Sequence, residues 1–124
     1  KPSLTFKVSV AKRASKISRI TVGLPGGLSF VRHRVHKKLR VTGVSLRGAN
    51  KKSLALSHGR LVITLRKPSA AVTVTLGSLS LKESTGLRTK ARRNRVKSLK
   101  LTVIVRNARH NSKTLRLKVK VAHL

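Results

Sequence analysis

Residues 98–121 read SLKLTVIVRNARHNSKTLRLKVKV, and in this stretch apolar and polar residues alternate in two separate runs. In the first run, from Leu99 to Val105, every second residue is apolar, and in the second, from Leu115 to Val121, Leu and Val alternate with Arg and Lys. A period of two is typical of half-buried strands, because successive side chains of a strand point to opposite faces. The polar residues from Asn107 to Ser112 lie between the runs. The stretch therefore predicts two neighbouring strands joined by a loop.

The same alternation recurs along the rest of the chain. A tight hairpin is predicted across Ser57–Arg60, and a type II turn is predicted where Pro25 is followed by Gly26. Gly43 is expected to mark a bulge in an extended stretch, and Pro68 to break the chain between two strands. The further extended stretches are Leu4–Val10, Ile20–Leu24, Leu39–Leu46, Leu54–Leu56, Leu61–Leu65 and Val72–Leu76.

Two segments depart from this pattern. Residues 31–38 are short and basic, and they are expected to form a loop or a helical turn. Ser80 and Glu83 have the spacing of a capping box, which predicts a short helix from Leu81 to Arg93. We therefore expect an all-β fold with a single domain over residues 1–124. Its predicted architecture is an antiparallel Ig-like β-sandwich of about seven or eight strands with one short helix near 81–93.

Three runs of the sequence carry a family resemblance. They are VGLPGGLSF (residues 22–30), GRLVITL (59–65) and SLKLTVIVRNA (98–108). Together they resemble Ig-like or uncharacterised β-rich modules in secreted and cell-surface proteins of actinobacteria, and the resemblance extends over most of the chain. The shared motifs are turns and strands. The resemblance therefore implies an Ig-like sandwich and a secreted or cell-surface location, but it assigns no functional residue.

The charge of the chain is almost entirely of one sign. Thirty-one Lys and Arg residues stand against one acid, Glu83, and give a formal net charge of +30. Charge at this density says little about the fold, but it indicates a polyanionic partner. Hydrophobic residues make up 39% of the chain, which is too many for a disordered basic tail, so a folded core is expected.

Composition also limits the chemistry of the chain. It contains no Cys, which excludes disulfides and thiolate metal sites. Apolar runs such as Leu61–Ile63 are too short for a transmembrane segment. The sequence begins at Lys1 without a leader-like segment, as expected of a processed or trimmed chain.

Carboxylate chemistry is nearly excluded because the chain has only one acidic residue. Acid–base pairs, hydrolase triads and calcium or magnesium cages need several Asp or Glu residues, whereas Glu83 is expected only to cap a helix. We therefore expect no catalytic residue, no cofactor and no metal. His33 and His36 would share one face of a helical turn, but the neighbouring cations oppose a divalent metal. The remaining histidines are expected in a turn, in a loop and near the C-terminus: His58, His110 and His123.

Three basic clusters are the candidate polyanion-binding residues. The first is Arg32, Arg34, Lys37, Lys38 and Arg40; the second is Arg88, Lys90, Arg92, Arg93, Arg95, Lys97 and Lys100; the third, on the outward face of the last strand, is Arg116, Lys118 and Lys120. An alternative is that these charges only keep the surface soluble. A surface of mixed charge would do so without self-repulsion, which favours a binding role.

Recognition of particular bases is disfavoured. The chain has no Trp or Tyr, and Phe6 and Phe30 lie at strand positions that are expected to be buried, so bases have no stacking platform. The leading hypothesis is a non-enzymatic, exported module that binds polyanions electrostatically: DNA or RNA backbones, teichoic-type or acidic polysaccharides, or anionic surfaces. One alternative is a structural subunit that assembles as a homo-oligomer through its edge strands into a surface array or filament. Another is an intracellular nucleic-acid packaging or ribosome-associated protein.

Overall fold

The computed structural model describes residues 3–11, 13–35, 37–77, 79–86 and 98–122. The described residues form strands that pair only in antiparallel ladders, so the predicted all-β antiparallel fold is confirmed. The strands are β1 (Ser3–Ser9), β2 (Ile17–Gly23), β3 (Leu28–Phe30), β4 (Arg32–Val35), β5 (Lys38–Val41), β6 (Val44–Arg47), β7 (Lys51–Ser57), β8 (Arg60–Ser69), β9 (Ala71–Leu76), β10 (Leu81–Glu83), β11 (Ser98–Asn107) and β12 (Ser112–Ala122). They exceed the predicted seven or eight because β3, β4 and β10 form where no strand was predicted, and because the stretch expected over residues 39–46 is divided into β5 and β6.

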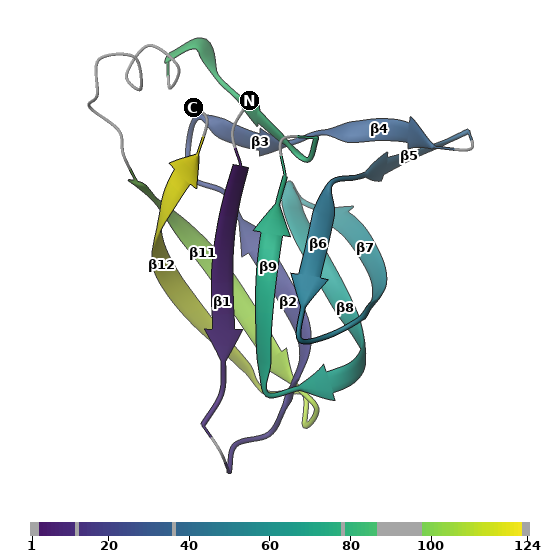
Figure 1. Ribbon diagram of the computed structural model, residues 1–124, viewed down its shortest axis with the longest axis vertical. Coiled ribbons are helices and arrows are strands. Elements are labelled where there is room, and N and C mark those ends of the chain that lie inside the picture. Colours follow the sequence, from purple (N-terminus) through teal and green to yellow (C-terminus); the bar gives the residue numbers. More distant parts are fainter. Residues whose placement is uncertain (1–2, 12, 36, 78, 87–97, 123–124) are drawn as a thin grey trace.

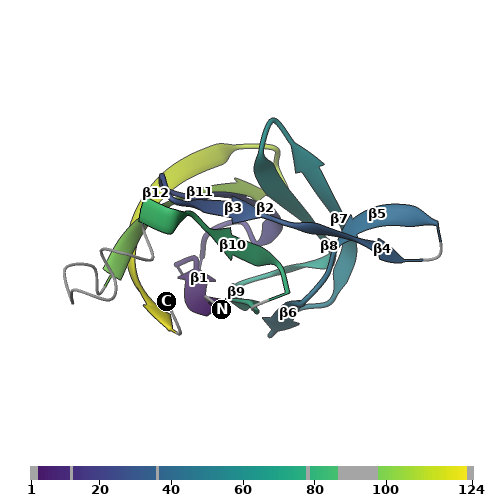
Figure 2. The same cartoon turned by 90° about the horizontal axis from the view of Figure 1, so that it is seen from above.

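Eight strands form one long sheet in the order β6-β9-β1-β12-β11-β2-β8-β7. Seen from above, this sheet bends around the core (Figure 2). The bend falls at β12, which makes nine registered pairs with β11 but only two with β1. We call β6, β9 and β1 the small half and β12, β11, β2, β8 and β7 the large half. Two-stranded ladders, β10–β3 and β4–β5, lie across the upper end (Figure 1).

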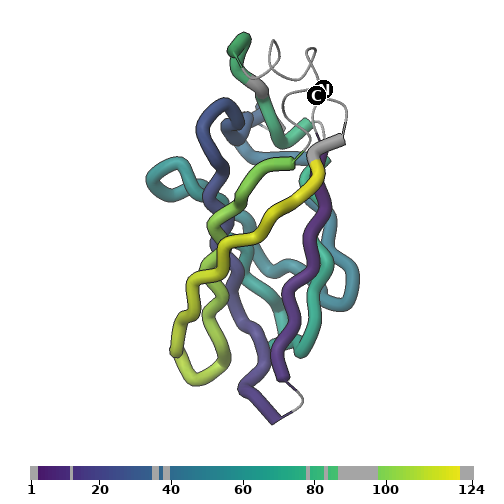
Figure 3. The backbone as a smooth tube through the Cα atoms, turned by 90° about the vertical axis from the view of Figure 1, so that its left-hand side faces the viewer, coloured from purple at the N-terminus to yellow at the C-terminus, as the bar shows by residue number. Residues whose placement is uncertain are grey.

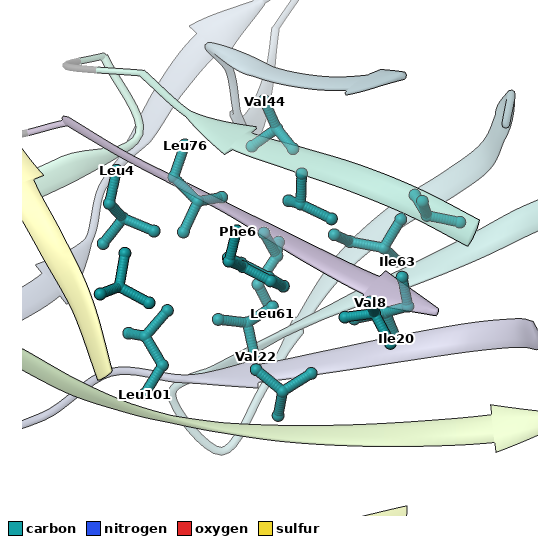
Figure 4. Close-up of a cluster of buried hydrophobic side chains, with 14 of the residues drawn as sticks. Leu4, Phe6, Val8, Ile20, Val22, Val44, Leu61, Ile63, Leu76 and Leu101 are labelled. Carbon is teal, nitrogen blue, oxygen red and sulfur yellow. The ribbon is translucent and has the colours of Figure 1, made fainter. Parts of the chain in front are cut away.

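The core fills the space between the two halves. Phe6 and Val74 come from the small half and Ile63 from the large half, and the three are at most 5% exposed. Apolar side chains from strands far apart in the sequence meet there (Figure 4). The alternation of the sequence explains this arrangement, because every second residue of each long strand faces inward. Burial of this apolar surface is the main stabilising contribution to the fold.

Two predicted turns are confirmed. His58 and Gly59 have φ of 52° and 77° between the paired residues Ser57 and Arg60. Positive φ at both central residues is the signature of the type I′ turn that suits a two-residue hairpin. The loop between β11 and β12 is organised by Asn107, whose Oδ1 accepts hydrogen bonds from the backbone N–H groups of residues 109 and 111 at 2.9 and 3.0 Å.

Three local predictions need correction. The positive φ of the turn after β2 falls on Gly27, at 95°, one residue later than a Pro25–Gly26 type II turn requires. Gly43 (φ 80°) does not bulge a continuous strand but separates β5 from β6. Strand β8 continues through Pro68 to Ser69. Pro68 fits there because the register between β2 and β8 is interrupted at this point, so no ladder hydrogen bond from its nitrogen is needed.

The loop or helical turn expected over residues 31–38 is a β-hairpin instead. Arg32 pairs with Val41 and His33 with Arg40 in the β4–β5 ladder. Lys37, with φ of 67°, lies in the turn. The high charge obscured a short alternation in which Val35, Leu39 and Val41 recur, and pairing between adjacent segments was enough to form strands.

The prediction of a helix near 81–93 is also wrong for its first residues. Leu81–Glu83 form β10, which pairs with β3. Ser80 does not cap a helix, because its hydroxyl donates to the carbonyl oxygen of Gly77 at 2.7 Å and closes a turn. Helical backbone in the described part of the chain is limited to residues 85 and 86, and 87–97 lie outside the described residues. Leu81 is 5% exposed, so tertiary burial as a strand outweighed the local capping signal.

Candidate functional site

The outward face of the large half gathers basic side chains from several strands. Inward positions of β11 and β12 hold the core residues, so the residues between them point away from the core. The cations at these outward positions are Lys100, Arg106, Arg116, Lys118 and Lys120, joined by Arg19 from β2 and Arg60 from the start of β8. We call this set the basic face.

The register places like charges directly opposite each other on this face. Lys100 of β11 is registered with Lys118 of β12, and Arg106 of β11 with Arg19 of β2. Lys100, Lys118 and Arg19 are exposed, whereas Arg106 is half-buried. Like charges that face each other across a ladder destabilise a sheet. Such pairs are therefore costly unless an anion lies between them.

The side chain of Arg60 reaches from β8 to Gly23 of β2 on the basic face. A Cβ atom at Gly23 would lie 3.6 Å from Nε of Arg60, so the Arg60 side chain lies over the glycine. The same Cβ would lie 3.6 Å from Cβ of Thr102, the residue paired with Arg116. The guanidinium of Arg60 is thereby brought from the edge of the hairpin toward the middle of the face.

The small half differs in its outward chemistry. Its outward positions are mostly hydroxyl-bearing, and Thr5 and Thr75 are hydrogen-bonded to each other with their Oγ1 atoms 3.2 Å apart. Lys7 and Arg47 are the cations at its described outward positions. The charge is therefore segregated, with the large half the more basic of the two outer surfaces.

Of the three predicted clusters, the third is placed on one surface. Arg116, Lys118 and Lys120 are exposed on the outward face of β12, as the period of two predicted. From the second cluster, only Lys100 is described, and it joins them across the ladder. The remaining members of that cluster lie outside the described residues: Arg88, Lys90, Arg92, Arg93, Arg95 and Lys97.

The first cluster lies on the β4–β5 hairpin, which projects from the upper end of the molecule (Figure 1). Arg32 and Arg40 line a hollow of about 220 Å³ between this hairpin and β7. Arg34 and Lys37 are exposed, and Lys38 belongs to β5. The hairpin is held by His33, whose Nε2 donates to the carbonyl oxygen of Leu79 at 2.7 Å.

Arg19, Arg60 and Arg106 were missed by the sequence analysis. The three lie in different strands, and none has another Lys or Arg within two residues of it, so no local cluster marks them. The parity of the strands held a usable signal, because Arg106 follows Lys100 at an even spacing and Arg19 precedes the buried Ile20. Their meeting on one face depends on the order β11-β2-β8, which a local pattern does not reveal.

The other chemical groups are dispersed. His33, His58 and His110 lie in β4, in the β7–β8 turn and in the β11–β12 loop, whereas His36 and His123 fall outside the described residues. In the described ranges no three His, Cys, Asp or Glu residues lie together in a way that could hold a metal ion. Glu83 is in β10 rather than at a helix end. Phe6 is 5% exposed and Phe30 is half-buried.

No protein-family model matches the chain, and no curated protein or solved structure matches it either. The structure also contains, among the residues it describes, no helix that is long and apolar enough to cross a membrane.

Proposed function

We propose that this chain is a non-enzymatic, highly basic module that binds polyanions electrostatically and without sequence specificity. The observation that carries the proposal is the register of the basic face, where Lys100 is opposite Lys118 and Arg106 is opposite Arg19. An anionic polymer laid across these strands relieves both repulsive pairs at once. The chain has a single carboxylate, Glu83, so it has few acidic side chains of its own to do so.

The mechanism is counterion release from the polymer. Lys and Arg side chains that contact phosphate, sulfate or carboxylate groups displace condensed cations, and the entropy of those ions favours binding. Arginine adds hydrogen bonds, because its guanidinium can donate to two oxygens of one group. With Phe6 buried and Phe30 half-buried, no aromatic side chain offers a full stacking surface for bases. Contacts to the backbone of the polymer account for binding of this kind.

The resemblance to Ig-like modules of actinobacterial surface proteins supports an exported setting. The bent sheet with a core between two halves is compatible with a sandwich of that type. In that setting, teichoic-type polymers, acidic polysaccharides, extracellular DNA or RNA and anionic surfaces are the candidate ligands. The charge chemistry is common to all of them.

The basic face is tested by removing charge from it and, in parallel, from the opposite surface. Lys100→Gln with Lys118→Gln removes two cations from the basic face, whereas Lys7→Gln with Arg47→Gln removes two from the small half. Binding of unrelated DNA duplexes is measured as log affinity against log salt. The first double variant is expected to flatten the slope by about 1.8, since each phosphate neutralised on DNA contributes about 0.9. Equal slopes for both double variants would show that only the net charge matters.

The polymer itself is identified by competition. Duplex DNA, single-stranded RNA, heparin and teichoic acid are compared at matched ionic strength against one labelled ligand. Similar affinities for DNA duplexes of different sequence are expected, because nothing on the basic face reads base edges. Strong preference for one DNA sequence would contradict the proposal.

Assembly through edge strands is the alternative, and the edges of the long sheet oppose it. Strand β6 has four residues, and β7 begins with Lys51 and Lys52. Short edges and edge lysines are features that prevent pairing between sheets. Light scattering after size-exclusion chromatography separates the two proposals, because edge assembly requires a multimer.

A further inference from the structure

The sheet is nearly open along one line, between β1 and β12. Their ladder consists of Ser3↔Ala122 and Leu4↔Val121 alone. Below these pairs the two strands diverge, with the purple β1 and the yellow β12 separating toward the lower end (Figure 3). Beyond Leu4, no described strand is paired with this side of β1, and none is paired with the matching side of β12 from Ser112 to Lys120. We call this open line the seam.

Two hollows follow the seam. The upper one, of about 280 Å³, lies between Thr5–Lys7 of β1 and Leu117–Lys120 of β12. The lower one, of about 360 Å³, lies between the end of β1 and the β11–β12 hairpin. Its lining comes from the end of β1 and the loop after it, and from the β11–β12 hairpin: Val8, Val10, Ala11, Val105, Lys113 and Leu115 are among these residues.

The seam combines an apolar floor with basic rims. Val8 is 2% exposed, whereas Leu115 and Leu117 are only half-buried although they face the core. Lys7 lies on the rim formed by β1, and Lys118 lies on the rim formed by β12. Lys113 lines the lower hollow from an inward position and remains exposed.

These features match an extended peptide better than a charged polymer. An edge with free N–H and C=O groups accepts a strand, and alternating pockets select its side chains. A strand lying in the seam turns every second side chain toward Leu115 and Leu117 and the others toward Lys7 and Lys118. A nucleic acid or polysaccharide has no apolar side chains to pack against the apolar floor. A second copy of this chain is opposed by a net charge of +30 on each molecule.

We propose that the seam binds an extended segment of another protein in which apolar residues alternate with Asp or Glu. The segment adds a strand beside β1 or β12, places its apolar side chains over the half-buried leucines and its carboxylates between the basic rims. This site shares Lys118 with the basic face, but the proposed polymer binding also uses the outward positions of β2, β8 and β11, which are not part of the seam.

The test uses labelled peptides of about eight residues, the length of an ordinary strand. The probe alternates Val and Glu, and its control has the same composition in two blocks, Val then Glu. Fluorescence anisotropy at about 150 mM salt is expected to give at least about tenfold tighter binding for the alternating peptide. Equal affinity of the two peptides would overturn the proposal, because charge alone would then explain binding.

Paired charge reversals locate the peptide. Lys7→Glu with Lys113→Glu is expected to weaken the alternating peptide by about tenfold or more, while Arg19→Glu with Arg60→Glu, which changes the net charge equally, affects it less than about threefold. The second pair is expected to weaken duplex DNA instead. Equal effects of the two pairs on the peptide would place it outside the seam and overturn this proposal, whatever the DNA result.

Two further measurements test the apolar floor and the free backbone edges of the seam. Leu117→Thr is expected to weaken the alternating peptide by about fivefold, and hydrogen exchange of residues 5–9 and 113–119 is expected to slow when the peptide binds. If the leucine variant fails to fold, the exposed Lys7 and Lys113 still decide the question. Unchanged exchange in both segments would refute an open seam that accepts a strand. A dimer of the protein that persists when the peptide is added would refute it as well.

Discussion

The pair Lys100 and Lys118 predicts an unusual result, a surface substitution that stabilises the protein and weakens its binding. The two residues are opposite each other in the β11–β12 ladder and both are exposed. Lys118→Glu changes this contact from repulsion to attraction. Residues in such a position have Cβ atoms about 4.5–5.5 Å apart, so their charged ends lie roughly 7 Å apart.

The magnitude follows from Coulomb's law. Two unit charges about 7 Å apart in water interact by about 0.6 kcal/mol, so reversing one of them changes the energy by about 1.2 kcal/mol before screening. With Debye lengths of about 30, 8 and 3 Å, roughly 1, 0.5 and 0.1 kcal/mol remain at low, physiological and molar salt. For a domain of this size, 1 kcal/mol corresponds to a shift in Tm of about 3–6 °C. Lys118→Glu is therefore expected to raise Tm most at low salt.

The assay is thermal unfolding followed by circular dichroism at the three salt concentrations. Lys52→Glu is the matched control, since Lys52 is exposed on β7 and the net charge changes equally. The difference between the two variants isolates the Lys100 contact from the general relief of repulsion. A duplex-DNA titration of the same variants is expected to show weaker binding for Lys118→Glu. The reasoning fails if Lys118→Glu is no more stable than Lys52→Glu at low salt, or if its advantage persists at molar salt.

Three other predictions concern stability. Leu101→Ala, at a side chain that is 0% exposed, is expected to lower the free energy of unfolding by about 2–5 kcal/mol in urea titrations; a loss under about 1 kcal/mol would mean that the core relaxes into the cavity. Gly48→Ala is expected to lower it by about 2 kcal/mol, because φ is 88° and the new Cβ would lie 2.7 Å from the carbonyl oxygen of Ala71; an unchanged urea midpoint would contradict this. For the unaltered protein, Tm is expected to rise with salt, because salt screens the repulsion between the cations. The rise is expected to be larger with a multivalent anion than with chloride at equal ionic strength, because the anion also binds the native state. A Tm that responds to neither would show that the charges are too dispersed to affect stability.

Much of the fold was predictable because strand periodicity is local. The alternation from Leu99 to Val105 and from Leu115 to Val121 identifies β11, β12 and their inward faces, and Ser57–Arg60 identifies a hairpin. Where a local prediction was wrong, tertiary contacts outweighed the local sequence signal. Leu81–Glu83 carries a capping pattern, yet pairing with β3 and the burial of Leu81 favour a strand.

The sequence by itself determined the all-β class, the inward side of each long strand and the sign of the chain's own charge, because each depends only on composition or on the order of neighbouring residues. The tertiary structure alone decided which strands lie side by side. The order β12-β11-β2-β8 brings Lys118, Lys100 and Arg19 onto one face. The short β1–β12 ladder leaves the seam open. Strand order and register join residues that are distant in the sequence, and a period of two is the same for every arrangement of the same strands.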